Sequence, residues 1–453
     1  MEDEPSRYNA ARASHVDVAG PLAWPDRDYM LVRQASHVRA HPASWQIWTA
    51  SLLLALMPLC FAVSGRLKSL PMAALFVAGL VLLATRAEAR HACRLAWPVV
   101  TVCVLRLLYD LGNFLGHRLD WPTLDLPAQT LLFLGIAAVF TLPLKQRVIA
   151  IGFSLTALLL GAVSLYQRYM LGADRPYGLN GGDWAAVEFA MYLLVLVLLS
   201  MLQALRPGTR RGDRWLHVAA VVVGLYGAVL TQSRGPLLSF APIYLGLMLW
   251  FAMRSRHWRR ILALFAVTVL GMLTATATLH RELVERLTNV PAEIASYDTG
   301  GDGNGSAVGE RLEMWRTAWQ AFGEHPLAGI GLDQFGVYVR EQAAAGKASP
   351  LIANYVHPHS EYLESMVAGG LPALLVLLLF LAVPLAFFAR HLGHAQEPVA
   401  ATAAAGVMVI GTYALCAFSD NVFYRAMPQS LYLFLVLGLA FTIGRLLHNA
   451  PSR

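Results

Sequence analysis

Charged residues are scarce in this sequence. Only 14% of its residues are Asp, Glu, Lys or Arg, whereas soluble domains contain about 25%. Hydrophobic residues make up 57% of the chain. This composition argues against an ordinary soluble domain and predicts that most of the chain lies in a lipid bilayer.

Several sequence signals are also missing. The chain begins Met-Glu-Asp-Glu-Pro5, which is not the basic start of a cleaved signal peptide. No glycine-rich nucleotide loop and no repeat of 20–50 residues are visible. The cysteines are few and have neither metal-binding nor redox spacing, so they are interpreted as apolar packing residues: Cys60, Cys93, Cys103 and Cys416.

Long apolar runs are abundant. A membrane-spanning helix needs about 20 consecutive apolar residues. The candidates are residues 45–63, 70–85, 95–112, 126–144, 148–171, 183–204, 215–231, 236–253, 261–279, 363–389, 398–418 and 429–446. Open strands cannot cross lipid, and a closed barrel shows alternating rather than solid apolar runs. The sequence therefore predicts an all-α polytopic membrane protein with about 12 transmembrane helices.

Basic residues are distributed unevenly between the two sides. One side has Arg86, Arg90, Arg94, Lys145, Arg147, Arg206, Arg210, Arg211, Arg214, Arg254, Arg256, Arg259, Arg260 and Arg390, and the other Arg66, Lys68, Arg118, Arg175, Arg234 and Arg425. The positive-inside rule places the richer side and both termini in the cytoplasm. Topology thus accounts for the net charge of +7, and no nucleic-acid partner is expected.

This topology divides the chain into five segments. Residues 1–44 form a cytoplasmic tail, 45–279 the first nine transmembrane helices, 280–358 one large outside loop, 359–446 the last three helices and 447–453 a short tail. The outside is the periplasm if the cell is Gram-negative, so the protein is expected in the cell inner membrane. The long loop holds most of the polar motifs, which indicates that the chemistry occurs there.

Residues 309–322 in this loop have helical periodicity. Leu312, Trp315, Trp319 and Phe322 recur at spacings of three and four, which predicts an amphipathic helix lying on the membrane or capping the bundle. Arg311 falls in its first turn, where an anion could also meet free backbone N–H groups. The alternative is an ion pair between Arg311 and a nearby glutamate, Glu310 or Glu282.

A second arginine lies in the turn Thr231-Gln-Ser-Arg-Gly-Pro236. Gly235 and Pro236 break the helix there, so Arg234 is expected at the outer mouth of the bundle. Its planar guanidinium suits bidentate binding of a lipid phosphate. The plainer interpretation is an arginine that only snorkels to the interface.

The loop ends in His357-Pro-His-Ser-Glu-Tyr362, where the chain re-enters the membrane. His359 is the candidate general base, and Glu361 and Glu364 are candidates to orient or tune an imidazole. A metal site at His357 and His359 is not expected, because no third ligand has convincing spacing. Interfacial polar residues remain the alternative for both histidines.

Other charged residues have weaker signals. The stretch Asp298–Ser306 hints at a calcium loop with Glu313 but lacks the central glycine, and a mobile surface loop is preferred. Arg106 and Asp110, four apart on one helix, are expected to pair. Arg168 and Glu188 lie near the outer ends of their spans and are expected to line the cavity. Asp420 and Arg425 are expected either to support the site or to be ordinary loop residues.

Taken in order, these motifs resemble the O-antigen ligase and polymerase superfamily. They are Thr231–Gly235, Gly309-Glu-Arg with Trp315, Pro326-Leu-Ala-Gly-Ile-Gly331 and His357–Tyr362. The single large loop is most similar to the ligases, whose histidine motif precedes a glycine turn, here Gly369-Gly370-Leu-Pro-Ala373. Ala373 stands where a second small turn residue is often glycine.

The resemblance implies a membrane glycosyltransferase of the GT-C type. Its donor would be a glycan on undecaprenyl pyrophosphate, and its acceptor a sugar hydroxyl of lipid A-core oligosaccharide. His359 matches the family's essential histidine, Arg234 and Arg311 match two essential arginines, and Asp420 matches an acidic residue more weakly. No cofactor and no metal are implied, and we expect helix 309–322 to act as a lid hinged at Gly300–Gly305.

Three alternatives remain. An O-antigen polymerase uses the same donor with a second lipid-linked glycan as acceptor, and a protein O-oligosaccharyltransferase modifies Ser or Thr. A transporter is a different class, but no interrupted helix pair in two matching halves is visible.

Overall fold

The computed structural model describes residues 43–63, 65–179, 185–254, 257–278 and 307–449. Every regular element in these ranges is a helix, as the apolar runs predict. The helices are α2 (Ser44–Ala62), α3 (Gly65–Thr85), α4 (Ala87–Leu95), α5 (Trp97–His117), α6 (Asp125–Ala137), α7 (Gln146–Tyr169), α8 (Ala186–Leu205), α9 (Arg211–Leu230), α10 (Arg234–Arg254), α11 (Trp258–Thr278), α14 (Ala307–Glu324), α15 (Phe335–Ala344), α16 (Glu361–Ala389), α17 (Glu397–Cys416) and α18 (Ala426–His448). Short 3-10 turns cover Trp121–Leu124, Ala138–Thr141 and Pro350–Ile352.

Within these described ranges, ten helical segments are long and apolar enough to cross a membrane. The number rises to eleven if α3 and α4, which meet at a bend of 99°, form one broken span. The polytopic all-α class is confirmed, whereas the expected count of about 12 is not reached among the described residues. The tail at residues 1–42, the calcium-like stretch and the glycine hinge at 300–305 lie outside the described residues.

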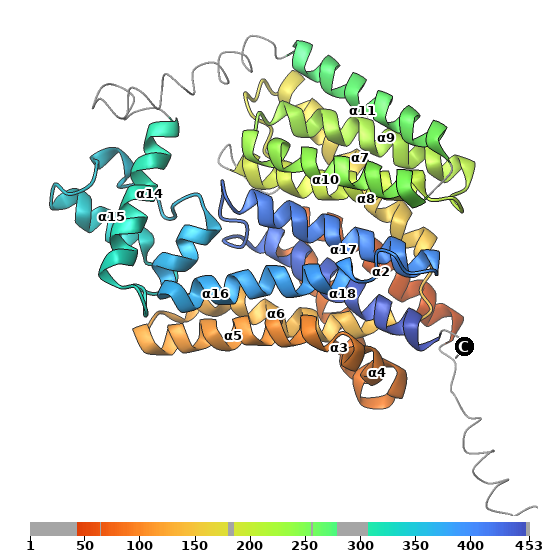
Figure 1. Cartoon of the computed structure of the whole chain (residues 1–453), viewed down its shortest axis with the longest axis horizontal. Helices are drawn as coiled ribbons and strands as arrows, with labels where there is room; N and C mark the ends of the chain where they lie inside the picture. The colour runs from red at the N-terminus through yellow and green to blue at the C-terminus, as the bar shows by residue number, and fades with distance from the viewer. Residues whose placement is uncertain (1–42, 64, 180–184, 255–256, 279–306, 450–453) are drawn as a thin grey trace, which may run out of the picture. The chain divides into compact units, whose positions relative to one another are not determined.

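The central helices differ from the peripheral ones in burial. Figure 1 shows α16, α17 and α18 packed between α5 and α6 on one side and the group α7 to α11 on the other. The apolar window of α8 is 89% buried, whereas that of α5 is 33% buried. An apolar helix that the protein does not cover faces lipid, so α8 forms the centre and α5 the edge.

Small residues allow close approach of two central helices. A Cβ atom added at Gly161 of α7 would lie 2.5 Å from the carbonyl oxygen of Val223 in α9. No side chain fits at that distance, and such contacts are typical of membrane helix interfaces. The cysteines agree with their packing interpretation, since all of them are free and Cys103 and Cys416 are buried.

The two glycine motifs of the sequence pack against each other. Helix α16 is broken at Gly369 and Gly370, and Gly370 has a φ of 67°. There the Leu371 N–H donates to the Pro326 carbonyl at 2.8 Å, and the Gly331 N–H donates to the Ala368 carbonyl at 3.0 Å. A Cβ atom on Gly370 would lie 2.4 Å from the Pro326 oxygen. The glycines thus fix the large loop to the start of α16.

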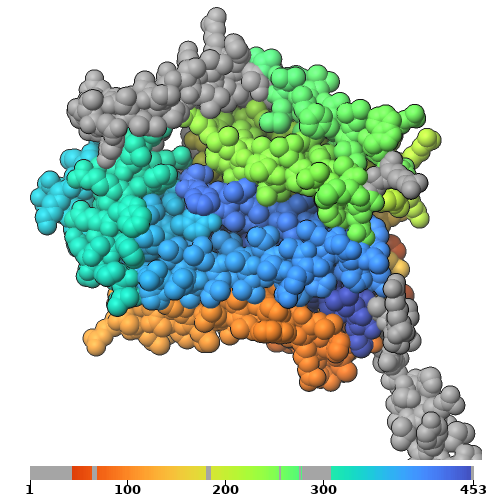
Figure 2. Space-filling model, in the orientation of Figure 1, coloured from red at the N-terminus to blue at the C-terminus, as the bar shows by residue number. Residues whose placement is uncertain are grey.

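Helix α14 confirms the helix predicted over residues 309–322, but its buried face is not the aromatic stripe. Met314, Ala318 and Ala321 are buried in a small second core with Phe335 of α15, while Trp319 is 55% exposed. The small residues pack inward because α14 lies close to α15 and α16. Figure 2 shows this lobe beside the blue C-terminal helices. Trp319 is thus left uncovered by the protein, and contact of the aromatic stripe with the membrane stays a prediction.

Candidate functional site

His359 lies at a sharp turn directly before α16. It has a φ of 51°, a left-handed conformation that is uncommon for residues other than glycine. The turn brings its Nδ1 atom to 3.1 Å from Oδ1 of Asp420 in the α17–α18 connection. The Glu361 N–H donates to the carbonyls of Ala417 and Asp420 and thereby fixes the connection against the turn.

The charge state of Asp420 suits it to orient the histidine. Burial acts to raise the pKa of this carboxyl, but the hydrogen bond from His359 and electrostatic interaction with the two histidines outweigh burial, so the pKa lies below its usual value. An ionised Asp420 accepts the Nδ1–H of His359, which leaves the lone pair on Nε2. That nitrogen is then available to accept a proton.

His357 is buried beside the same imidazole. Its ring centroid lies 4.4 Å from that of His359 and 4.7 Å from that of Tyr424. Burial and electrostatic interaction with His359 lower the pKa of His357 to about 4, so His357 is neutral near pH 7. Among the described residues its Nδ1 atom has no hydrogen-bond partner, although buried polar atoms in proteins are rarely left in that state.

Glu361 does not orient the histidine. Its Oε1 atom lies 3.5 Å from Nη2 of Arg106, and its Oε2 atom accepts the Phe423 N–H at 3.1 Å. Arg106 also lies 3.7 Å from Asp110, which confirms the predicted pair. The first helical turn directs Glu361 away from His359 and toward α5, so the acid that contacts the imidazole is Asp420, from a segment 61 residues away.

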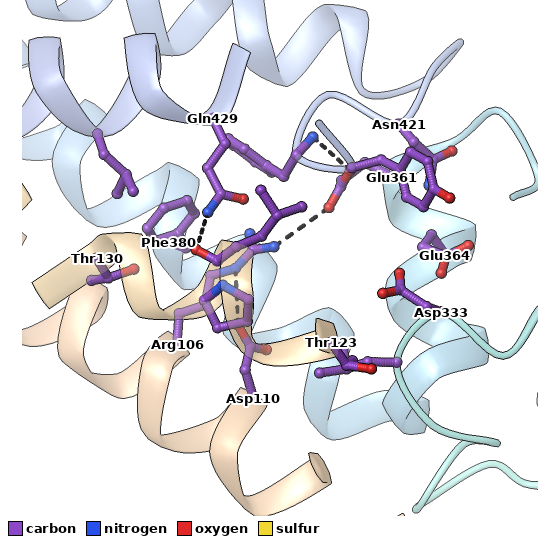
Figure 3. Close-up of a pocket in the computed structure, with 16 residues that line it drawn as sticks. Arg106, Asp110, Thr123, Thr130, Asp333, Glu361, Glu364, Phe380, Asn421 and Gln429 are labelled. Atoms are coloured by element: carbon purple, nitrogen blue, oxygen red, sulfur yellow. Dashed lines mark hydrogen bonds and ion pairs between the residues drawn. The ribbon is translucent and has the colours of Figure 1, made fainter. Parts of the chain in front are cut away.

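A polar cavity of about 80 Å³ lies behind this turn. Figure 3 shows Arg106 between Asp110 of α5 and Glu361 of α16, and Asp333 close to Glu364. The amide of Asn421 lies close enough to Glu364 to stabilise its carboxylate, although the geometry falls short of a hydrogen bond within the described residues. Burial raises the pKa of the Asp333 carboxyl. Asp333 follows Gly331-Leu332 and has a left-handed φ of 59°. Sequence patterns gave no signal for this residue.

Arg234 begins α10, next to the segment that carries Asp420. The preceding turn contains Gln232 with a φ of 54°. Arg175, which sequence analysis did not single out, donates to the Thr231 carbonyl and to Ser233 Oγ at 3.0 and 3.1 Å. A Cβ atom on Gly235 would lie 2.1 Å from Ser419 Oγ, so the start of α10 lies directly against the segment that carries Asp420, and a larger residue there would displace the Ser419 hydroxyl.

Arg311 approaches from the other side, on α14. Neighbouring Glu310 accepts a hydrogen bond from the Tyr355 hydroxyl. Burial, this hydrogen bond and the Glu310 charge raise the pKa of Tyr355 to about 12, and Arg311 acts in the opposite direction. Arg311 is therefore within electrostatic reach of Tyr355, whose ring centroid is 5.7 Å from that of His359. Glu282, its other predicted partner, lies outside the described residues.

Helix α14 is anchored directly to the histidine turn. The indole N–H of Trp315 donates to the Pro358 carbonyl at 3.0 Å. This bond and the Tyr355–Glu310 bond place the start of α14 beside His359. Two predicted supporting residues pair with each other instead of reaching His359: Arg425 Nε lies 2.6 Å from Glu188 Oε1. Arg168 bonds the Asp174 carbonyl at 3.0 Å.

The structure places a carboxylate beside the two histidines that sequence spacing did not reveal. One potential ligand atom from each of His357, His359 and Asp420 lies within 4.8 Å of the others. Asp420 reaches the histidines across the fold, and the expectation that no metal binds there stays a prediction.

Residues 219–378, roughly a third of the chain, match a family model described as O-antigen ligase. The match includes Arg234, Arg311 and His359 but ends before Asp420. The chain is also 26% identical over 275 residues to an uncharacterized protein of Haemophilus influenzae, an alignment that covers 59% of this chain and 67% of that protein. The family match covers the region that carries the motifs, and it supports their resemblance to the O-antigen ligase and polymerase type for residues 219–378.

Proposed function

We propose that this protein is an O-antigen ligase. It transfers a glycan from undecaprenyl pyrophosphate to a sugar hydroxyl of lipid A-core oligosaccharide, on the periplasmic face of the inner membrane. The observation that carries the proposal is the His359–Asp420 pair at 3.1 Å, next to the start of α10 and within a turn held by α14. The family match to residues 219–378 supports the same reaction class.

The proposed step is a single displacement. The acceptor oxygen forms a bond to the anomeric carbon while the bond from that carbon to the pyrophosphate oxygen breaks. His359 accepts the acceptor's hydroxyl proton, and undecaprenyl pyrophosphate leaves with the bonding electron pair. Attack opposite the leaving group inverts the anomeric centre. Asp420 stabilises the imidazolium that forms, as the carboxylate of a catalytic triad does.

The two arginines would act on the leaving group. Negative charge develops on the pyrophosphate as the bond breaks, and preorganised cations stabilise it. Arg234 and Arg311 belong to different helices that both approach the histidine turn, through the Gly235–Ser419 contact and the Trp315–Pro358 bond. Guanidinium groups in these positions would replace a divalent metal, so the proposed reaction requires none.

A direct assay separates this proposal from its alternatives. Purified protein is mixed with lipid-linked glycan and lipid A-core, without ATP and with EDTA. We expect core-linked product at a rate within about twofold of the untreated rate, roughly 0.4 kcal/mol in barrier. Longer lipid-linked glycan in place of core-linked product would indicate a polymerase, and modified Ser or Thr a protein oligosaccharyltransferase. Activity that disappears with EDTA and returns with magnesium would contradict the mechanism.

A further inference from the structure

The side chains of His357, His359 and Asp420 bring three potential metal-ligand atoms close together. The Nδ1–Oδ1 distance between His359 and Asp420 is 3.1 Å, close to the separation of about 3.3 Å between two ligands of a tetrahedral zinc ion. The widest separation in the set is at most 4.8 Å, so the third ligand has to move inward by at most about 1.5 Å.

An independent observation also points to a ligand. His357 is only 8% exposed, and its Nδ1 atom has no hydrogen-bond partner among the described residues. Metal-binding imidazoles are neutral and offer a free lone pair. Two imidazoles with one carboxylate favour borderline divalent cations such as Zn²⁺ over Mg²⁺ or Ca²⁺, which prefer sets made entirely of oxygen.

We propose that His357, His359 and Asp420 bind a zinc-class divalent cation and that this binding inhibits the enzyme. A neutral imidazole has a single unprotonated ring nitrogen. Once the metal occupies that lone pair on His359, the imidazole cannot accept a proton from the acceptor, whichever nitrogen is the ligand. The inhibitory effect therefore rests on the proposed role of His359 as the base, whereas the binding itself does not.

Metal binding is tested on chelator-treated protein without substrates. Co²⁺ replaces Zn²⁺ as a visible probe, and its absorption is titrated in wild type, His357→Ala and Asp420→Asn. The matched control is His325→Ala, which removes an exposed histidine near the end of α14. We expect saturable binding of one Co²⁺, displacement by Zn²⁺, and weakening by at least about tenfold in the two site variants, since loss of even an outer partner costs about 10–100-fold. The control should bind as wild type does.

Inhibition is then measured in the transfer assay. Saturating Zn²⁺ should lower the rate by at least tenfold, and EDTA should restore it. The residual rate of His357→Ala should resist Zn²⁺ concentrations that inhibit wild type. Absence of a Co²⁺ signal, equal binding by the site variants, or a rate that rises with Zn²⁺ would each overturn the proposal. Binding of Co²⁺ by a protein with no transfer activity would leave the metal site intact and contradict the proposed function alone.

Discussion

The two ends of the helix bundle differ in how completely their charged and polar side chains are paired. At the end formed by the start of α7, α9 and α17, Arg206 binds Glu397 through two contacts of 2.7 Å. Arg147 binds Asp213 through contacts of 2.6 and 2.8 Å. In the described part of that end, each of these carboxylates has a two-point partner, which is typical of a structural ion pair.

The described part of the end that carries His359 has more buried polar atoms without hydrogen-bond partners. They include His357 Nδ1, one nitrogen of Arg106, Glu364 Oε2 and both amide atoms of Asn421, whereas toward the opposite end one nitrogen each of Arg260 and Arg445 lacks a partner. Leaving a buried polar atom unpaired costs about 1–3 kcal/mol. Such unmet hydrogen-bonding capacity is expected where a ligand completes the site, so the contrast separates a structural end from a functional one.

Removal of the proposed base should cause the largest loss of transfer activity among the substitutions at either end of the bundle. His359→Ala is expected to lower transfer by about 10²–10⁴-fold, the usual contribution of a general base. His357→Ala should have a milder effect, because its ring is not held by Asp420. Transfer rates are compared at equal protein levels in the membrane, and a His359→Ala variant that keeps more than about a tenth of the activity would refute the assignment.

Asp420→Asn tests whether the orienting carboxylate matters. The amide cannot stabilise an imidazolium and can favour the wrong tautomer, an exchange that costs up to about 10⁴-fold in serine proteases. We expect a large loss of turnover with donor affinity unchanged. The control is Asp174→Asn, which removes a carboxylate that is 97% exposed; equal rates for the two variants would mean that Asp420 has no special role.

Arginine-to-lysine substitutions at the active end come next in size. Arg234→Lys and Arg311→Lys keep the charge but lose the bidentate fork. Each should weaken donor binding by about tenfold or more, since a hydrogen bond to a charged group contributes about 1.5–3 kcal/mol. Binding is measured with lipid-linked donor in detergent. Unchanged donor affinity in the corresponding alanine variants would leave both arginines with a structural role only.

The smallest effect is expected at the opposite end. Arg206→Gln breaks the ion pair with Glu397. The side chain of Arg206 is 26% exposed and that of Glu397 is 42% exposed. Partly exposed pairs contribute up to about 1 kcal/mol, so thermal stability should fall slightly while turnover stays within about twofold. A loss of transfer comparable to that of Asp420→Asn would erase the distinction between the two ends.

Part of this organisation could be predicted from the sequence. Each of the twelve apolar runs overlaps a helix in the described part of the chain, the amphipathic helix exists as α14, and Arg106 pairs with Asp110 as their spacing indicates. These features depend on composition or on residues less than two helical turns apart. Local periodicity and bilayer thickness determine them, so the chain carries the information directly.

The partners of the site residues were decided only by the tertiary structure. Nothing near His359 in sequence indicated that Asp420 would contact it while Glu361, two residues away, would pair with Arg106. Nor could periodicity show that α14 buries Met314, Ala318 and Ala321 rather than its aromatic stripe. A helix has several faces that could be covered, and a turn can direct a side chain several ways. The choice depends on contacts between distant parts of the chain, such as the packing of the glycine motif at Pro326–Gly331 against Gly369 and Gly370, which exist only in the assembled fold.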